Sequence, residues 1–86
     1  MIDIDESQQV LKSIFETSKD KHVKGAAEAA NQYTDYFKLG KLEKSEYIQL
    51  MNFVIDTNNI NRTIKNIKQM DSMNDTIVDL IQKVGT

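Results

Sequence analysis

The sequence predicts a single all-α domain over residues 1–86, organised as a long antiparallel helical hairpin followed by a short helix. Two observations lead to this prediction. The chain has no proline and only three glycines, so the residues that mark β-turns and long loops are nearly absent. Apolar side chains recur every three or four positions, which is the period of an α-helix. There is no cysteine, which excludes a disulfide framework and a thiolate metal site.

The first predicted helix covers about residues 6–39, because one apolar stripe continues through this whole stretch at helical spacing. Asp5 is the expected N-cap, with Gln8 in the position of its capping-box partner. Gly40 supplies the left-handed conformation that commonly ends a helix. At 1.5 Å per residue such a rod is about 50 Å long. Helices of that length are typical of hairpins and coiled coils.

The apolar pattern restarts after the glycine and predicts a second helix over about residues 44–70. The polar run at residues 56–59 is its weakest part, because Asn, Asp and Thr side chains compete for backbone hydrogen bonds. Residues 72–75 have the Ser-x-x-Asp form of a helix start. We therefore expect a break near residues 71–74 and a short C-terminal helix over about residues 74–84. The alternative is a second helix that continues to its end.

Two paired helices would leave each apolar stripe only half covered, which predicts that copies of the chain or another protein cover the rest. The small side chains of residues 25–30 would let another helix approach closely. The expected helix–helix contacts are Gly25, Ala26, Ala29, Ala30, Tyr33, Phe37, Met51, Val54, Ile64 and Ile67. The expected core is Leu11, Ile14, Phe15, Ala26, Ala29, Tyr33, Phe37, Leu50, Met51, Val54, Ile60, Ile64 and Ile67.

The composition argues against catalysis and against a bound metal or cofactor. His22 is the only histidine, and a packing role at the edge of the apolar stripe is the stronger interpretation. Asp71, Asp75 and Asp79 follow one another at helical spacing, but no histidine lies near them in the sequence to complete a transition-metal site. We interpret this ridge as a solvated helix face. The sequence therefore predicts no enzyme and no cofactor.

Basic residues are concentrated in two segments that a hairpin would bring to one end. The chain has 11 basic and 13 acidic side chains and a formal net charge of −2. Such a cluster is a candidate surface for an anionic partner, although mutual repulsion there would also argue against a simple hairpin. Nucleic acid is a disfavoured partner, since the net charge is negative and only one arginine is present. The candidate partner-binding residues are Lys19, Lys21, Lys24, Arg62, Lys65 and Lys68.

Residues 33–47, with the sequence YTDYFKLGKLEKSEY, contain a recognisable turn. A helix ends at a glycine, and an apolar, an acidic and an aromatic residue begin the next helix. This segment resembles the turn of the short C-terminal (SHOCT) type, and it is similar to the small helical-hairpin virion proteins of tailed phages that carry the same turn. Glu43 stands where that pattern has a Ser or Thr cap. The resemblance implies a helical hairpin used in protein assembly and transfers no catalytic residue.

The location and function expected from the sequence follow from these features. No apolar stretch is long enough to span a bilayer, and the N-terminus lacks the basic and apolar regions of a signal peptide. We expect a cytoplasmic or virion protein with no membrane partner. The leading hypothesis is a non-enzymatic structural or assembly protein, a homo-oligomer or the partner of another protein, and a phage virion component. The alternative is a small regulatory protein that binds a host protein or nucleic acid through its basic cluster.

Overall fold

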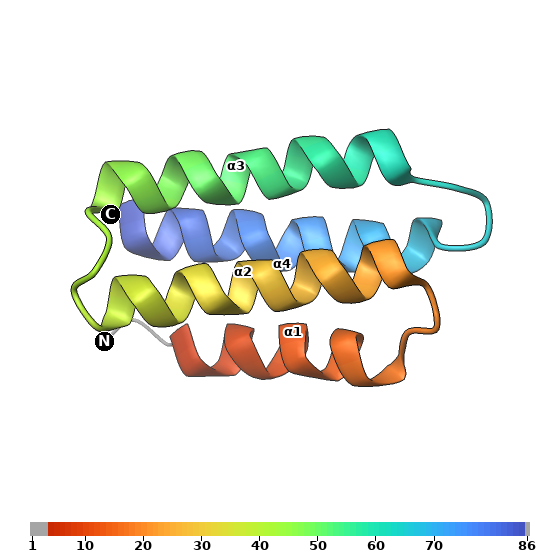
Figure 1. Cartoon of the computed structure of the whole chain (residues 1–86), viewed down its shortest axis with the longest axis horizontal. Helices are drawn as coiled ribbons and strands as arrows, with labels where there is room; N and C mark the ends of the chain where they lie inside the picture. The colour runs from red at the N-terminus through yellow and green to blue at the C-terminus, as the bar shows by residue number, and fades with distance from the viewer. Residues whose placement is uncertain (1–3, 86) are drawn as a thin grey trace.

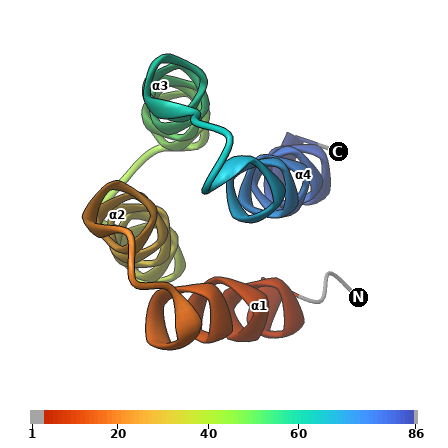
Figure 2. The same cartoon turned by 90° about the vertical axis from the view of Figure 1, so that its right-hand side faces the viewer.

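The computed structural model describes residues 4–85, and within this range the chain forms helices and no strand (Figure 1). The helices are α1 (Ile4–Thr17), α2 (Lys21–Lys38), α3 (Lys44–Asn61) and α4 (Ile67–Gly85). They pack as a bundle of 35 × 21 × 19 Å, in which α1 is inclined to the other three (Figure 2). The predicted all-α class is confirmed. The two long helices and the short helix of the prediction are replaced by four helices of similar length.

The predicted continuous helix over about residues 6–39 is wrong, because the chain breaks between α1 and α2. Asp20 caps α2, and its carboxylate accepts the backbone N–H groups of His22 at 2.8 Å and Val23 at 3.2 Å. The Ser18 hydroxyl in turn accepts the N–H of Asp20 at 3.1 Å. These side chains satisfy the free N–H groups that a helix start exposes, so the break is stable without glycine or proline.

Gly40 ends α2 as the sequence predicts. It has a φ of 77°, and it is the only residue with positive φ in the described part of the chain. The N–H of Gly40 donates to the carbonyl of Phe37 at 3.0 Å, and the N–H of Lys41 donates to the carbonyl of Tyr36 at 2.8 Å. This pairing satisfies the last carbonyls of the helix. The chain then turns, and α3 runs back beside α2 (Figure 1).

The predicted second helix, about residues 44–70, and the predicted third helix, about residues 74–84, have the wrong boundaries. The chain leaves α3 at Asn61 and enters α4 at Ile67, so the expected break near residues 71–74 lies inside regular helix. The loop before α4 is closed by a reciprocal pair. The N–H of Thr63 donates to Asn66 Oδ1 at 2.7 Å, and the N–H of Asn66 donates to the Thr63 hydroxyl at 3.3 Å.

The hydrophobic core lies between the four helices, and α4 contributes most to it. The buried apolar side chains are Leu11, Val23, Ala27, Ala30, Tyr47, Met51, Val54, Met70, Met73, Ile77, Leu80 and Val84. Only Leu11, Met51 and Val54 of these were in the predicted core. Ile60 and Ile64 were expected inside but are 82% and 96% exposed. The break at Asp20 resets the helical phase, and α3 ends before Ile64 can face the core.

This core changes the argument for association. The sequence-based reasoning assumed two helices whose apolar stripes were half covered. In the structure each helix packs against two neighbours around the bundle, so most of the stripe residues are covered within one chain (Figure 2). Any association must therefore use the apolar surface that stays exposed on the folded bundle.

Candidate functional site

All six basic residues named from the sequence lie at one end of the bundle. They sit in or beside the α1–α2 and α3–α4 loops, which meet at the same end (Figure 1). Residues 16–24 and 62–71 hold these six basic side chains and three acidic ones, a formal charge of +3 in a chain whose net charge is −2. We call the set Lys19, Lys21, Lys24, Arg62, Lys65 and Lys68 the basic end.

Two hydrogen bonds hold the loops of the basic end together. Asn66 Nδ2 donates to Asp20 Oδ2 at 2.9 Å, and the Ser18 hydroxyl donates to Gln69 Oε1 at 3.1 Å. The bond from Asn66, followed by the N–H of Val23, lowers the pKa of the Asp20 carboxyl below its usual 3.8. The loops therefore present their cations from a defined platform and not from two independent segments.

The cations differ in how freely they can meet a partner. Lys24 Nζ lies 4.8 Å from the centre of the Phe15 ring, and Arg62 forms an ion pair with Asp71 at 3.0 Å. Within residues 4–85 the other four lysines have no ion-pair partner. Lys19 and Lys65 line an open hollow of about 500 Å³ between the two loops. The hollow therefore offers an anionic group one lysine from each loop, together with the carboxylate of Asp20, which Asn66 already occupies with a hydrogen bond.

An apolar groove runs between α2 and α3 on the outside of the bundle. Its volume is about 270 Å³. The small residues Gly25, Ala26 and Ala29 line it from α2, and Phe53 and Val54 line it from α3. Phe53 is 65% exposed although it is large and apolar. We call this groove, together with the Phe53 side chain, the α2–α3 groove.

The structure divides the predicted helix–helix contacts into three groups. Ala30, Met51 and Val54 are buried in the chain's own core, while Ile64 and Ile67 are exposed at the basic end. The third group lies on α2 and is exposed or partly buried. Its members line the groove or lie near the α2–α3 turn: Gly25, Ala26, Ala29, Tyr33 and Phe37. The sequence-based prediction missed Phe53. Apolar residues are so frequent over residues 47–55 that their spacing alone does not show which of them face away from the core.

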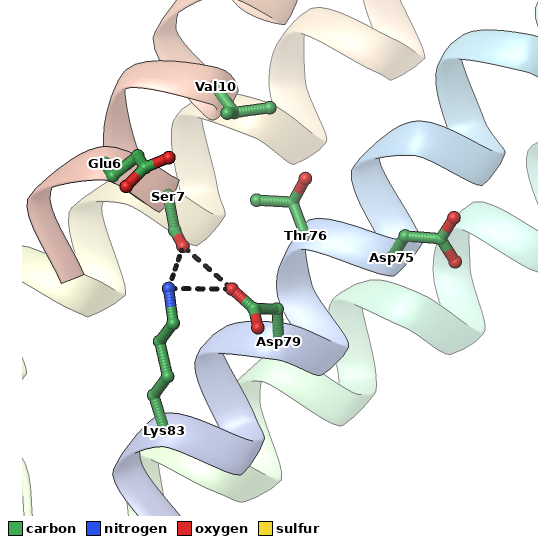
Figure 3. Close-up of a pocket in the computed structure, with 7 residues that line it drawn as sticks. All are labelled: Glu6, Ser7, Val10, Asp75, Thr76, Asp79 and Lys83. Carbon is green, nitrogen blue, oxygen red and sulfur yellow. Dashed lines mark hydrogen bonds and ion pairs between the residues drawn. The ribbon is translucent and has the colours of Figure 1, made fainter. Parts of the chain in front are cut away.

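A second hollow, between α1 and α4, carries polar groups that the sequence did not bring together (Figure 3). The Ser7 hydroxyl donates to Asp79 Oδ2 at 3.1 Å, and Lys83 Nζ lies 3.1 Å from Ser7 and 2.9 Å from Asp79. The bond from Lys83 lowers the pKa of Asp79. Because the ammonium donates to both oxygens, it cannot take the serine proton. The trio is an interhelical contact between α1 and α4.

The three aspartates that the sequence places in one ridge have different partners in the structure. Asp79 is held by Lys83 and Asp71 by Arg62, and only Asp75 has no ion pair in the described residues. Residues 4–85 contain no group of three or more His, Cys, Asp or Glu side chains placed to hold a metal ion.

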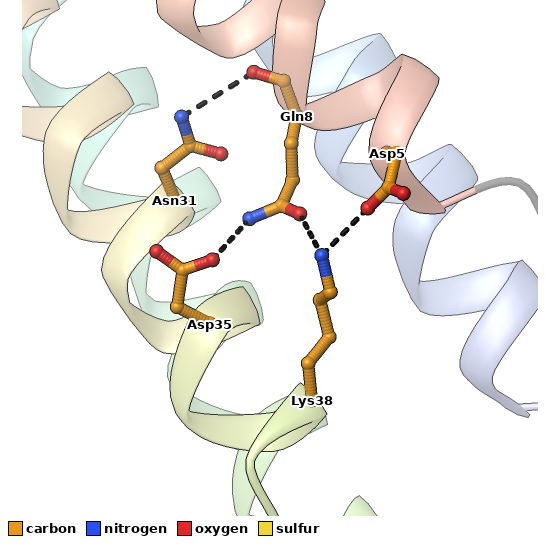
Figure 4. A network of polar contacts seen from close by, with 5 residues as sticks. All are labelled: Asp5, Gln8, Asn31, Asp35 and Lys38. Carbon is orange, nitrogen blue, oxygen red and sulfur yellow. Dashed lines mark hydrogen bonds and ion pairs between the residues drawn. The ribbon is translucent and has the colours of Figure 1, made fainter.

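A polar network joins α1 to α2 (Figure 4). Lys38 Nζ lies 2.6 Å from Asp5 and 2.9 Å from Gln8, and Gln8 also donates to Asp35 at 2.8 Å. The predicted cap pair at the first helix is therefore wrong, since Asp5 and Gln8 lie inside α1 and contact α2 instead. The bond to Asp5 raises the pKa of Lys38. Asn31 Oδ1 is buried beside this network and has no hydrogen-bond partner in the described part of the chain.

No helix among residues 4–85 is both long and apolar enough to cross a membrane. Comparison of the chain with protein-family models, with curated proteins and with solved structures finds no match in any of the three.

Proposed function

We propose that this chain is a non-enzymatic structural or assembly protein that acts through helix–helix association at the α2–α3 groove. The observation that carries the proposal is an exposed phenylalanine beside a groove lined by small residues. Phe53 is 65% exposed, while the small side chains of Gly25, Ala26 and Ala29 leave space on the α2 side of the groove. Aromatic side chains, phenylalanine among them, are enriched in protein–protein interfaces relative to the rest of the surface. The Ser7 hydroxyl, which is fixed by an ion pair, gives no support to an enzymatic alternative.

The resemblance of residues 33–47 to tailed-phage virion proteins extends the proposal to a virion component. In those proteins the turn belongs to an assembly element, and in this chain it orders α2 and α3, the two helices that form the groove. Identification of this chain among the proteins of purified phage particles would support the extension. Its absence from such particles, in a phage that encodes it, would exclude the virion role and leave the assembly role standing.

The variant Phe53→Ser tests the assembly role, and Leu39→Ser is its matched control. Leu39 is 69% exposed, as much as Phe53, but lies at the α2–α3 turn outside the groove. We expect sedimentation equilibrium and co-purification from the native source to show association for the wild type and for Leu39→Ser. Phe53→Ser should lose it. Association that survives in Phe53→Ser, or a wild-type chain that stays monomeric and purifies with nothing, would contradict the proposal.

The basic end favours a second candidate function, a regulator that binds an anionic host protein or nucleic acid. The supporting observation is that hydrogen-bonded loops hold four lysines without ion-pair partners among residues 4–85 at one end of the bundle, and two of them, Lys19 and Lys65, line one hollow. We expect Lys21→Gln, Lys65→Gln and Lys68→Gln to weaken binding to an oligonucleotide and to reduce its salt dependence by roughly one charge each. Lys41→Gln and Lys44→Gln, at the opposite end, are the controls. Equal effects of both sets would show that binding has no specific surface.

A further inference from the structure

We propose that the occupant of the α2–α3 groove is a second copy of this chain, related by a two-fold axis that runs parallel to the helices. The inference rests on the proposed function and specifies its partner. It starts from the register of the two helices, which pair in opposite directions around the turn at Gly40. Ala29 and Phe53 both line the groove, at the middle of α2 and α3. The projecting ring and the small-residue hollow therefore lie side by side, at the same level of the bundle.

A two-fold interface needs this arrangement, since the same surface must act as both partners. An axis parallel to the helices places α2 of one copy over α3 of the other and keeps the level unchanged. Phe53 of each copy then faces Ala29 of the other, and Thr57 faces Gly25. An axis perpendicular to the helices would instead place Phe53 against Phe53 and leave both hollows empty. Shape therefore selects the parallel axis.

The hollow has room for the incoming ring. A Cβ atom built on Gly25 would have no neighbour within 4 Å, so the space above this residue is open. The groove volume of about 270 Å³ is also unfilled by the chain's own side chains. On the α2 side Gly25, Ala26 and Ala29 lie between His22 and Tyr33, so a partner ring can approach the α2 backbone closely at these three small residues.

The area of the face is sufficient for a reversible dimer. Helices α2 and α3 have 18 residues each. At 1.5 Å per residue and a helix width of about 10 Å, two such helices present about 540 Å² per copy, or about 1,100 Å² in a pair. This is just above the roughly 1,000 Å² that a specific interface requires and below the roughly 1,600 Å² of a standard one.

The parallel axis makes a prediction about salt. It brings the basic ends of the two copies to the same side of the dimer. Lys21 of each copy then lies opposite Asn61 of the other, which has no charge to compensate it. The two basic ends therefore repel one another, and the apolar contact must overcome this repulsion. The Debye length is about 8 Å at physiological ionic strength. Raising the salt concentration should therefore strengthen the dimer. A complex held by an acidic partner on the same lysines would weaken instead.

Cross-linking tests the axis directly, because the natural chain has no cysteine. We expect a mixture of Gly25→Cys and Thr57→Cys proteins to form a mixed disulfide dimer on mild oxidation, at least tenfold faster than either protein alone. Ala29→Cys alone should not cross-link. Cross-linking of Ala29→Cys alone, with none in the mixture, would overturn the parallel axis.

A groove-filling variant tests the second copy itself. Gly25→Leu should weaken self-association at least tenfold in sedimentation equilibrium while its thermal unfolding by circular dichroism stays cooperative, since a Cβ atom at this position meets no atom of its own chain and the rest of the side chain extends from there into the open groove. Wild-type self-association that is unaffected by Gly25→Leu would overturn the inference. A strictly monomeric wild type would also overturn it. If that monomer still binds a different protein and Phe53→Ser abolishes the binding, the proposed assembly function stands and only its self-association fails.

Discussion

Replacing Tyr47 with phenylalanine is expected to destabilise the bundle less than replacing its hydrogen-bond partner, Thr34. Both side chains are buried, and their hydroxyl oxygens lie 2.8 Å apart. Thr34 donates its single hydroxyl proton to the carbonyl of Ala30 at 2.8 Å. The proton shared between the two hydroxyls must therefore come from Tyr47. Tyr47 also stacks on Phe37, with ring centres 4.9 Å apart, and this contact survives the loss of the hydroxyl.

The magnitudes follow from which group is left without a partner. Tyr47→Phe removes one neutral hydrogen bond and leaves only an oxygen lone pair of Thr34 unsatisfied, which should lower the free energy of unfolding by about 1 kcal/mol. Thr34→Val leaves the Tyr47 hydroxyl buried with no acceptor, a cost of roughly 1–3 kcal/mol. The double variant removes both polar groups and keeps their shape, so it should lie near the wild type. For a domain of this size, about 1 kcal/mol corresponds to roughly 4–8 °C in Tm.

Urea unfolding of the wild type, both single variants and the double variant forms a double-mutant cycle. We expect the destabilisation of the double variant to be smaller than the sum of the single ones by at least about 1 kcal/mol. Strict additivity would show that the two hydroxyls do not interact in solution. A double variant that is less stable than either single variant would refute the reasoning, because it would show that the two hydroxyls stabilise the fold by more than their bond to each other.

Three further predictions concern single positions. Gly25→Ala should raise Tm by a few degrees in a thermal melt, because alanine is better than glycine inside a helix by roughly 0.5–1 kcal/mol and the added Cβ meets no neighbour. The lowered pKa of Asp20 makes its stabilisation present above pH 3.8 and lost as the pH falls further, so acid unfolding should affect the wild type more than Asp20→Asn, which keeps a capping oxygen. Burial raises the pKa of Tyr47 above its usual 10, so its stabilisation is present below pH 10 and lost as the pH rises through the raised value. The free energy of unfolding should therefore fall more steeply above pH 10 in the wild type than in Tyr47→Phe, and equal slopes would contradict this.

The fold class was readable from the sequence, but the helix ends were readable only where glycine marks them. Gly40 ends α2 in the left-handed conformation that few other residues adopt. The break before α2 depends on Asp20, which caps the helix. The apolar spacing of residues 14–22 continues at helical period across this position, so it does not reveal that the chain turns there. The loop before α4 depends on Thr63 and Asn66, which cap one another. Polar residues compete equally well for caps and for exposed helix positions, so spacing alone could not place these two breaks.

The surfaces were predictable to different degrees for a related reason. Charge is read directly from the sequence, and the basic end forms even though the long hairpin that predicted it is wrong. Any antiparallel bundle with turns near Asp20 and Asn66 gathers the same lysines. The apolar surface depends on helical phase, since a rotation of one residue moves a side chain by about 100° around the axis. Phe53 therefore lies outside the core while Tyr47 lies inside, where it contacts Thr34 and Phe37 of α2.

The direction of the proposed two-fold axis also connects the two surfaces. An axis parallel to the helices leaves the basic ends of both copies on one side, so the dimer presents twice the six basic side chains of one chain. A polyanion long enough to reach both ends would then bind the second one intramolecularly, at high effective concentration. Phe53→Ser should therefore weaken binding of a long oligonucleotide, although Phe53 lies outside the basic end. A short oligonucleotide, which reaches only one copy, should bind the wild type and the variant alike. Equal losses for both lengths would mean that Phe53 contacts the nucleic acid itself, and no loss for either would mean that the two surfaces act independently.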